Sequence, residues 1–261
     1  MKASRQARLL LTDRDRRVLT LAWRFRLLSR DQFMLLAPFG SLTRANTRLA
    51  ALVRARLLSR KLLPVYPGQG GVQTLYFPGN ASSDLLHAEP EAQRRLTRRI
   101  HRWDLGQVEH VVAANQVLSV MLAALGPQAL SFRTEPELRQ VFSDCRLVPD
   151  GWLAFETRGK AFNCFLEVDL HHEGLTEWRG KVLRYLEYAE SRRHQELFGF
   201  RSVRVLVLAR STRRLDHVRR IAEQAGRLFL FAEMDAVDTR TVLNPVWLPA
   251  TGSTRIRLTE A

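Results

Sequence analysis

Residues 41–58 read SLTRANTRLAALVRARLL, and this stretch decides how the first third of the chain is interpreted. Ser41 or Thr43 is suited to cap a helix, because either hydroxyl can accept a hydrogen bond from a free backbone N–H of the first turn. Helical spacing then separates an apolar face from a basic one. The apolar face consists of Ala45, Leu49, Leu52 and Val53, and the other carries Arg44, Thr47, Arg48 and Arg54. The stretch therefore predicts a helix that buries one side and leaves a basic side open.

Two shorter amphipathic segments precede this helix. Residues 12–15 (TDRD) and 29–32 (SRDQ) each place a hydroxyl side chain three residues before an acid or amide, which is the pattern of a capping box at a helix N-terminus. A turn at 38–40 (PFG) ends the second segment. Three helices with a tight turn before the third predict a helix-turn-helix, the motif whose last helix enters the major groove of DNA.

The residues after the third helix predict a β-hairpin. Apolar runs at 57–63 and 72–77 flank a glycine-rich loop at 67–71. Together with the step Arg56-Leu57-Leu58, the pattern resembles that of winged-helix regulators, in which the hairpin forms the wing. The resemblance implies binding to double-stranded DNA. We expect base contacts from Arg44, Thr47 and Arg48, and phosphate or minor-groove contacts from Arg60, Lys61 and Gln69.

The positive charge of the chain is unevenly distributed. The 261 residues include 41 Lys and Arg against 26 Asp and Glu, a net charge of +15. Residues 1–62 hold 15 basic and 3 acidic side chains, whereas residues 103–261 hold 21 and 20. The remaining excess lies in a run of arginines at positions 94, 95, 98, 99 and 102. Charge that only kept the protein soluble would not be segregated in this way, so we expect a polyanionic partner.

The composition argues against a membrane or secreted protein. The most apolar stretch, Val111 to Leu125, is short for a membrane span and contains Asn115. The apolar block at 9–11 runs directly into charged residues, unlike the core of a signal peptide. Cys145 and Cys164 lack the spacing of a zinc site or a disulfide framework. We therefore expect a cytoplasmic protein that makes no membrane contact.

A second domain is predicted after the turn-rich residues 78–83 (PGNASS). We expect a winged helix-turn-helix domain over 1–80, a basic linker helix over 81–104 and a second domain over 105–261. The patterns in that domain predict the order helix, three strands, helix, strand, followed by a further helix and strand. The predicted strands lie at 131–133, 145–155, 162–170, 203–209 and 228–231, and the predicted helices at 108–125, 175–198 and 215–225. The expected architecture is a two-domain protein of mixed α+β and α/β character.

Acidic residues gather on two predicted strands of the second domain. Pro149-Asp150 is expected within one strand, and Glu167-Val168-Asp169 ends the next, with Glu167 and Asp169 on one face. The element order and these motifs resemble the PD-(D/E)xK restriction-endonuclease-like fold. The resemblance implies a Mg²⁺ ion held by Asp150, Glu167 and Asp169, since converging carboxylates are suitable ligands.

The sequence departs from that pattern at one position. Asp169 stands where the family places the lysine that helps to activate water, and Lys181 on the following helix is the candidate substitute. The catalytic set implied by the resemblance is then Asp150, Glu167 and Lys181. A carboxylate at the lysine position adds negative charge beside a scissile phosphate, so we expect weak or absent cleavage.

The combination of features resembles the replication-relaxation family over about residues 12–231. The resemblance rests on the winged helix, the basic linker, the motifs PDG at 149–151 and LEVD at 166–169, and a helix carrying Trp178, Lys181 and Tyr185. It implies a role in replication, mobilisation or transcriptional control of a plasmid or another bacterial mobile element. The sequence favours a double-stranded-DNA-binding protein, as a homodimer if its sites are symmetric. Two alternatives stay open: a metal-dependent endonuclease, and an adaptor that joins DNA to a relaxase or a replication initiator.

Overall fold

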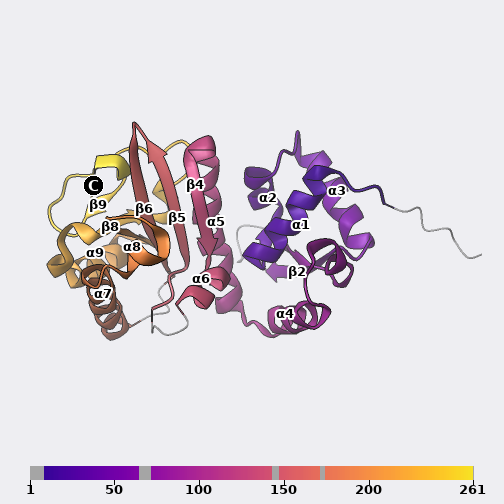
Figure 1. Ribbon diagram of the computed structural model, residues 1–261, viewed down its shortest axis with the longest axis horizontal. Coiled ribbons are helices and arrows are strands. Elements are labelled where there is room, and N and C mark those ends of the chain that lie inside the picture. Colours follow the sequence, from indigo (N-terminus) through magenta and orange to yellow (C-terminus); the bar gives the residue numbers. More distant parts are fainter. Residues whose placement is uncertain (1–8, 65–71, 143–146, 171–173, 261) are drawn as a thin grey trace, which may run out of the picture. The chain divides into compact units, whose positions relative to one another are not determined.

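The computed structural model describes residues 9–64, 72–142, 147–170 and 174–260 of a mixed α and β protein. The chain divides into two compact units, Met1–Val108 and Glu109–Ala261 (Figure 1). The first unit contains a three-stranded sheet and the second a six-stranded one. The segment predicted as a linker, 81–104, contains helix α4 (Pro90–Arg102), which packs on the sheet of the first unit.

The first unit begins with the three helices that the capping patterns predicted. Thr12 and Ser29 form capping boxes with Asp15 and Gln32, and Ser41 caps the third helix. A short strand pairs with the second strand of the hairpin and was not predicted, because two residues are too few to show a periodic pattern. The elements are α1 (Asp13–Phe25), β1 (Leu28–Ser29), α2 (Arg30–Leu36), α3 (Leu42–Arg54), β2 (Leu58–Pro64), β3 (Val72–Pro78), the 3-10 turns η1 (Asn80–Ser82) and η2 (Asp84–Leu86), and α4.

A buried carboxylate joins α1 to α3. Asp15 is fully buried, and its Oδ1 accepts a hydrogen bond of 2.8 Å from Nε of Arg48. Its Oδ2 accepts a second bond of 2.7 Å from the backbone N–H of Thr12. Burial by itself would raise the pKa of Asp15, but these donors outweigh it and lower the pKa to about 2. The pair sets the two helices against each other at the margin of a core that includes Leu19 and Leu49.

The end of α3 is fastened to the end of the hairpin. Arg56 adopts a left-handed conformation with φ of 59°, which turns the chain from α3 into β2. Its carbonyl accepts a bond from the N–H of Ala81, and Leu57 accepts one from Gly79, each at 3.0 Å. A Cβ atom on Gly79 would lie 2.3 Å from the Arg56 oxygen, so only glycine allows this approach. The hairpin strands β2 and β3 are antiparallel, and the sheet order is β1-β3-β2.

The second unit begins within α5 and is built on one sheet with the order β4-β5-β6-β7-β8-β9. The pairs β4/β5 and β5/β6 are antiparallel, β6, β7 and β8 are parallel, and β9 is antiparallel to β8. The elements are α5 (Leu105–Leu125), β4 (Ala129–Thr134), α6 (Glu135–Val141), β5 (Gly151–Thr157), β6 (Lys160–Asp169), α7 (Leu175–Glu190), α8 (Arg193–Phe198), β7 (Arg204–Ala209), α9 (Thr212–Ile221), β8 (Phe229–Glu233) and β9 (Leu248–Pro249), with 3-10 turns η3 (Gly126–Gln128), η4 (Glu223–Leu228), η5 (Met234–Ala236) and η6 (Leu258–Glu260).

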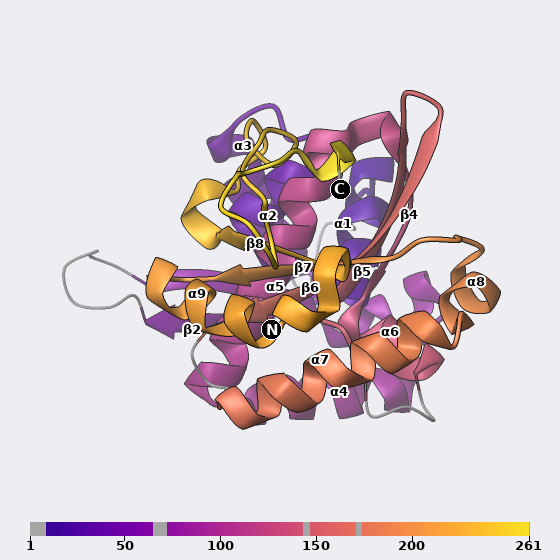
Figure 2. The same ribbon diagram turned by 90° about the vertical axis from the view of Figure 1, so that its left-hand side faces the viewer.

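One face of this sheet carries the main core. Sheet residues Trp152, Phe165 and Phe231 pack there against Trp178 of α7 and Leu215 of α9, and all of them are buried. The helices α7 and α9 pack against each other on this face, as the turned view shows (Figure 2). Strand alternation puts Glu167 and Asp169 on the same face as Phe165. The carboxylates thus lie under the helical layer.

Two predicted boundaries in the second unit were wrong, and one helix was not predicted. Asp150 does not lie in a strand, because β5 begins only at Gly151. The predicted helix over 175–198 is broken at Arg192, whose φ of 57° is incompatible with a continuous helix. Helix α6 was not predicted, although Thr134 and Glu137 form a capping box at its start. Cys145 lies outside the described residues.

Helix α5 is the most apolar of the described helices. The segment Leu105–Gln128 is long and apolar enough to cross a membrane, with a mean hydropathy of 1.5. Of the 18-residue apolar window within it, 56% is buried inside the protein, as in a helix that packs in a core. Leu118 of α5 lies beside Gly151 at the start of β5.

We predict that Asp15→Asn destabilises the first unit by about 1–3 kcal/mol at neutral pH, because Arg48 loses a charged acceptor in a buried position. The folded pKa of about 2 lies below the ordinary value of 3.8, so the wild-type advantage should be present above pH 3.8 and should disappear as the pH falls towards 2. Urea denaturation of both proteins across this range measures it. Asp13→Asn, an exposed acid in the same turn, is the matched control and should cost less than about 1 kcal/mol. Equal losses in the two variants would contradict the prediction.

Candidate functional site

The candidate DNA-contact residues of the first unit differ in how much of their bonding capacity is used within the protein. Arg44 and Thr47 are exposed on α3, and Arg60 is exposed on β2. Arg48 is held by Asp15, and one of its terminal nitrogens also donates to the carbonyl of Leu10 at 2.7 Å. The first three side chains are open to a ligand, whereas Arg48 orients α3. Gln69 lies outside the described residues.

Lys61 has an internal role as well. Its Nζ donates to the carbonyls of Ile100 at 2.9 Å and of Trp103 at 3.0 Å. These carbonyls belong to the C-terminal end of α4, where helical backbone oxygens lack partners and where a positive charge is favourable. Lys61 therefore caps α4 from the neighbouring strand β2.

The topology of the second unit brings Asp150 beside the carboxyl end of β6. Because β5 runs antiparallel to β6, with Gly151 opposite Leu166, the residue before β5 must lie next to the last residues of β6. The N–H of Asp150 donates to the carbonyl of Leu166 at 3.0 Å. Asp150 and Glu167 consequently interact through their charges.

The carboxylate of Asp150 is paired with a histidine that the sequence did not indicate. Its Oδ1 lies 2.8 Å from Nε2 of His110 on α5, and its Oδ2 accepts a bond of 2.8 Å from the N–H of Val168. The negative charge of Asp150 raises the pKa of His110 to about 9. Burial alone would raise the pKa of Asp150, but His110, Lys181 and the Val168 N–H together lower it. His110 is thus a cation and Asp150 an anion at neutral pH.

Glu167 is the most deeply enclosed member of the group. Its Oε2 accepts a bond of 2.9 Å from Nζ of Lys181, and its Oε1 accepts one of 2.5 Å from the hydroxyl of Tyr185, both on α7. Nζ of Lys181 also lies 4.8 Å from the ring centre of Trp178, a cation–π contact. Burial, helped by the charge of Asp150, raises the pKa of Glu167 to about 7 despite these donors. The carboxyl group of Glu167 is therefore protonated more easily than that of an exposed glutamate.

Asp169 has a cation of its own. Its Oδ2 accepts a bond of 2.7 Å from Nε of Arg214 on α9, and its side chain has no exposed surface. The structure therefore brings Asp150, Glu167 and Lys181 into one electrostatic cluster, while Asp169 is neutralised by α9.

Protein donors already contact the carboxylates that the resemblance assigns to a Mg²⁺ ion. Each of the four carboxylate oxygens of Asp150 and Glu167 already accepts a bond from a protein donor. Within the described ranges, no three or more His, Cys, Asp or Glu side chains are grouped closely enough to hold a metal. Two cations, His110 and Lys181, supply the positive charge that the resemblance assigns to a metal.

Three residues that bond to these acids, His110, Arg214 and Tyr185, were not predicted as their partners from the sequence. His110 lies 40 residues before Asp150 in an apolar helix, where no motif marks it as the partner of an acid. Arg214 belongs to a run of surface-like arginines at the start of α9. Tyr185 was recognised as part of an apolar stripe, but the direction of its hydroxyl towards Glu167 depends on how α7 packs.

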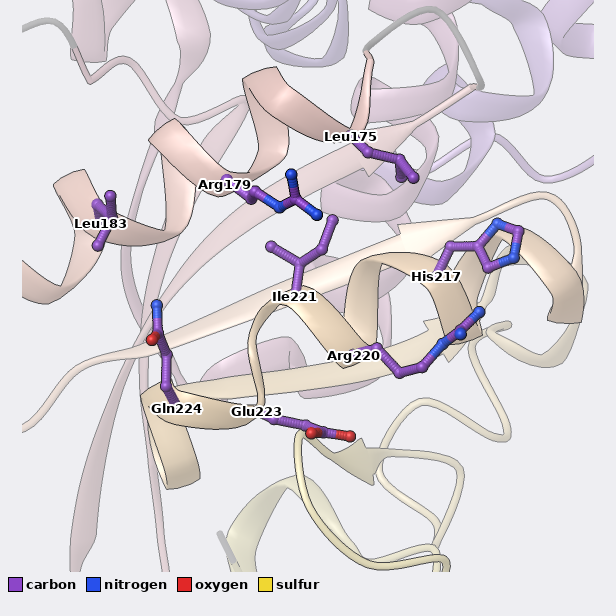
Figure 3. A pocket seen from close by; sticks show the side chains of 8 residues that line it. All are labelled: Leu175, Arg179, Leu183, His217, Arg220, Ile221, Glu223 and Gln224. Carbon is purple, nitrogen blue, oxygen red and sulfur yellow. The ribbon is translucent and has the colours of Figure 1, made fainter.

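A shallow groove of about 780 Å³ lies elsewhere on the second unit, between α7 and α9 with η4 (Figure 3). Arg179 and His217 face it from the two helices, and the partly exposed Leu175 and Leu183 lie at its α7 side. None of the clustered carboxylates lines this groove. It is a feature separate from the Asp150 and Glu167 cluster.

We predict that His110→Gln removes a pH-dependent part of the stability of the second unit. The pKa of His110 is raised from 6.5 to about 9 on folding, so its contribution is complete below pH 6.5 and is lost as the pH rises through about 9. The difference in free energy of unfolding between wild type and variant, measured in urea between these values, should therefore shrink with rising pH. His217→Gln, which removes a histidine of the groove and leaves Asp150 untouched, is the comparison variant. A constant difference for His110→Gln would show that its pairing with Asp150 is not formed.

Comparison with known proteins identifies a family for this chain. Neither the curated proteins nor the solved structures contain a match to the chain. A family model described as replication-relaxation matches residues 19–203. This match runs from α1 into the loop before β7 and includes both Asp150 and Glu167. The chain therefore belongs to the replication-relaxation family.

Proposed function

We propose that the first unit is a winged helix that binds double-stranded DNA through α3 and the β2–β3 hairpin. The observation that carries the proposal is the exposed basic face of α3. Ala45, Leu49 and Leu52 turn inwards and are fully buried, so Arg44 and Thr47 point outwards from the same helix. In a helix-turn-helix this outward face is the one that meets base edges.

The hydrogen bonds within the first unit indicate which of its basic residues contact DNA directly in this proposal. Arg44 has the fork of donors that recognises guanine in the major groove, and Thr47 can contact either a base or a phosphate. Arg60 projects from the wing strand and is suited to a backbone phosphate. Arg48 and Lys61 act indirectly, since they position α3 and α4 through bonds inside the unit.

Membership of the replication-relaxation family supports a role in the replication or mobilisation of a plasmid or another mobile element. In that role the protein recognises a DNA site, and its proposed protein partner is a relaxase or a replication initiator. Co-purification of such an enzyme from a cell that carries the element would favour the adaptor form of this function. An inverted repeat in the selected DNA site would indicate a homodimer.

We predict that binding to a duplex of about 30 base pairs, roughly three helical turns, weakens steeply as salt rises from about 50 to about 200 mM, because neutralised phosphates release counterions. Arg60→Gln should weaken binding to every sequence. Arg44→Gln should cost about 1–3 kcal/mol on a selected site and much less on random DNA. Fluorescence anisotropy measures both. Arg240→Gln, a change to an exposed arginine of the second unit, is the control. If the affinity for DNA changed neither with salt nor in Arg44→Gln and Arg60→Gln, this surface would be excluded as the DNA site.

A second candidate function belongs to the second unit, because Asp150, Glu167 and Lys181 meet there as they do in PD-(D/E)xK nucleases. We propose that the unit has a restriction-endonuclease-like fold but is catalytically silent. The support is chemical. The four oxygens that would bind a metal are occupied by protein donors, and Asp169 stands at the position of the missing lysine. The unit then serves as a scaffold for DNA or protein contacts.

We predict no robust cleavage of supercoiled, linear or single-stranded DNA by the full chain with Mg²⁺ or Mn²⁺. The physical reason is that His110 and Lys181 neutralise the carboxylates in place of a metal. Gel assays of plasmid nicking provide the measurement. Nicking that is lost in both Asp150→Ala and Lys181→Ala, in variants that still fold and bind DNA, would overturn the silent assignment and establish an endonuclease.

A further inference from the structure

Helix α4 is the most densely basic helix of the first unit. Its inner face buries Gln93, Leu96 and Ile100, which hold the helix on the sheet. Its outer face is exposed and carries five arginines, at positions 94, 95, 98, 99 and 102. Like charges three and four residues apart destabilise an isolated helix, so such a cluster is unfavourable unless a polyanion balances it.

The helix is fixed to the hairpin by polar bonds as well as by packing. Nε2 of Gln93 donates to the carbonyl of Pro78, the last residue of β3, at 2.7 Å. Lys61 on β2 caps the other end of α4, and the ring of His101 stands edge-on to Phe77 at 5.5 Å between centres. The adjacent strand residue, Arg60, is the proposed phosphate contact. Helix α4 and the wing strands therefore form one rigid surface within the first unit.

Local acids neutralise only part of the charge of α4. Glu91 pairs with Arg94 at 2.9 Å and with Arg98 at 2.8 Å. Glu89 lies 3.7 Å from Arg95. These acids occupy the first turn, so their influence ends before the C-terminal half of the helix.

Arg99 and Arg102 make no ion pair with any residue of the described ranges. They lie three residues apart and share one side of the helix with each other. Stabilising the helix end does not require them, because Lys61 already bonds to the terminal carbonyls of Ile100 and Trp103. Two exposed guanidinium groups on a fixed helix are thus left without an internal function.

We propose that α4 is a second DNA-contact surface, on which Arg99 and Arg102 bind backbone phosphates of the duplex held by α3 and the wing. This inference rests on the proposed DNA binding of the first unit. We expect the arginines to contact the phosphate backbone and not the bases. The inner face of α4 is packed on the sheet, and a phosphate contact from the outer face requires only the positive charge of the side chain. The segment between the predicted domains is then part of the binding module.

The test compares two double variants of the full chain, Arg99→Gln with Arg102→Gln, and Arg94→Gln with Arg98→Gln as the matched control on the same helix. Each removes two exposed charges, but only the control pair is already bonded to an acid. Anisotropy titrations with a random duplex of about 30 base pairs, roughly three helical turns, give the dissociation constant at several salt concentrations. Thermal unfolding confirms that all variants fold.

Losing Arg99 and Arg102 should weaken binding by at least about 10-fold near 0.1 M salt and should lower the slope of log affinity against log salt by about 1.8, two phosphates at about 0.9 each. The control pair should change affinity by less than about 3-fold. Arg99→Lys with Arg102→Lys should restore binding, because a phosphate contact requires only the charge.

Two outcomes overturn the proposal, and they differ from a failure of DNA binding itself. Equal losses in the two glutamine pairs would mean that α4 contributes only its general charge. Unchanged affinity and slope after loss of Arg99 and Arg102, with binding still sensitive to Arg44→Gln and Arg60→Gln, would leave the winged-helix function intact and remove α4 from it. A wild-type chain that binds no duplex at all would refute both.

Discussion

Three acids at one end of the sheet, the buried Glu167 and Asp169 and the partly buried Asp150, impose the main constraint on the second unit. Asp150, Glu167 and Asp169 lie at the carboxyl end of β6. An ionised carboxylate without a partner in this position would strongly destabilise the folded state. Each is therefore matched by a donor from a different helix: His110 from α5, Lys181 and Tyr185 from α7, and Arg214 from α9. These bonds fix the positions of three helices relative to the sheet. The same bonds place a protein donor on each oxygen of Asp150 and Glu167.

The first unit also contains a buried carboxylate that requires a partner. Asp15 is buried between α1 and α3, and Arg48 neutralises it. The pairing sets the angle at which α3 presents its outer face, because a shift of either helix would separate the charges. Lys61 does the same for α4 by capping its end from β2. Two of the basic residues predicted to contact DNA, Arg48 and Lys61, thus hold α3 and α4 in place.

The basic residues of the first unit differ in whether they bond to another group of the protein, and this difference determines which of them can bind a phosphate. An arginine that already bonds to a buried acid cannot contribute its full charge to a phosphate, whereas an exposed and unpaired one can. On this criterion α3 offers Arg44, the wing offers Arg60, and α4 offers Arg99 and Arg102. The surface proposed for DNA is therefore built from three elements of a single unit. The second unit, whose charges are balanced internally, is suited to a scaffolding role.

Local patterns in the sequence determined the three helices at the start of the first unit, the strands of the hairpin, the segregation of charge and the membership of the replication-relaxation family. They did so because caps, periodicity and composition depend on residues close together along the chain. The placement of Asp150 outside β5 and the break at Arg192 were not readable in this way, since both depend on backbone conformations set by packing. The partners of the buried acids were decided by the tertiary structure alone. His110 meets Asp150 across 40 residues, and Arg214 meets Asp169 across 45, so only the paths of α5 and α9 over the sheet bring each cation to its carboxylate.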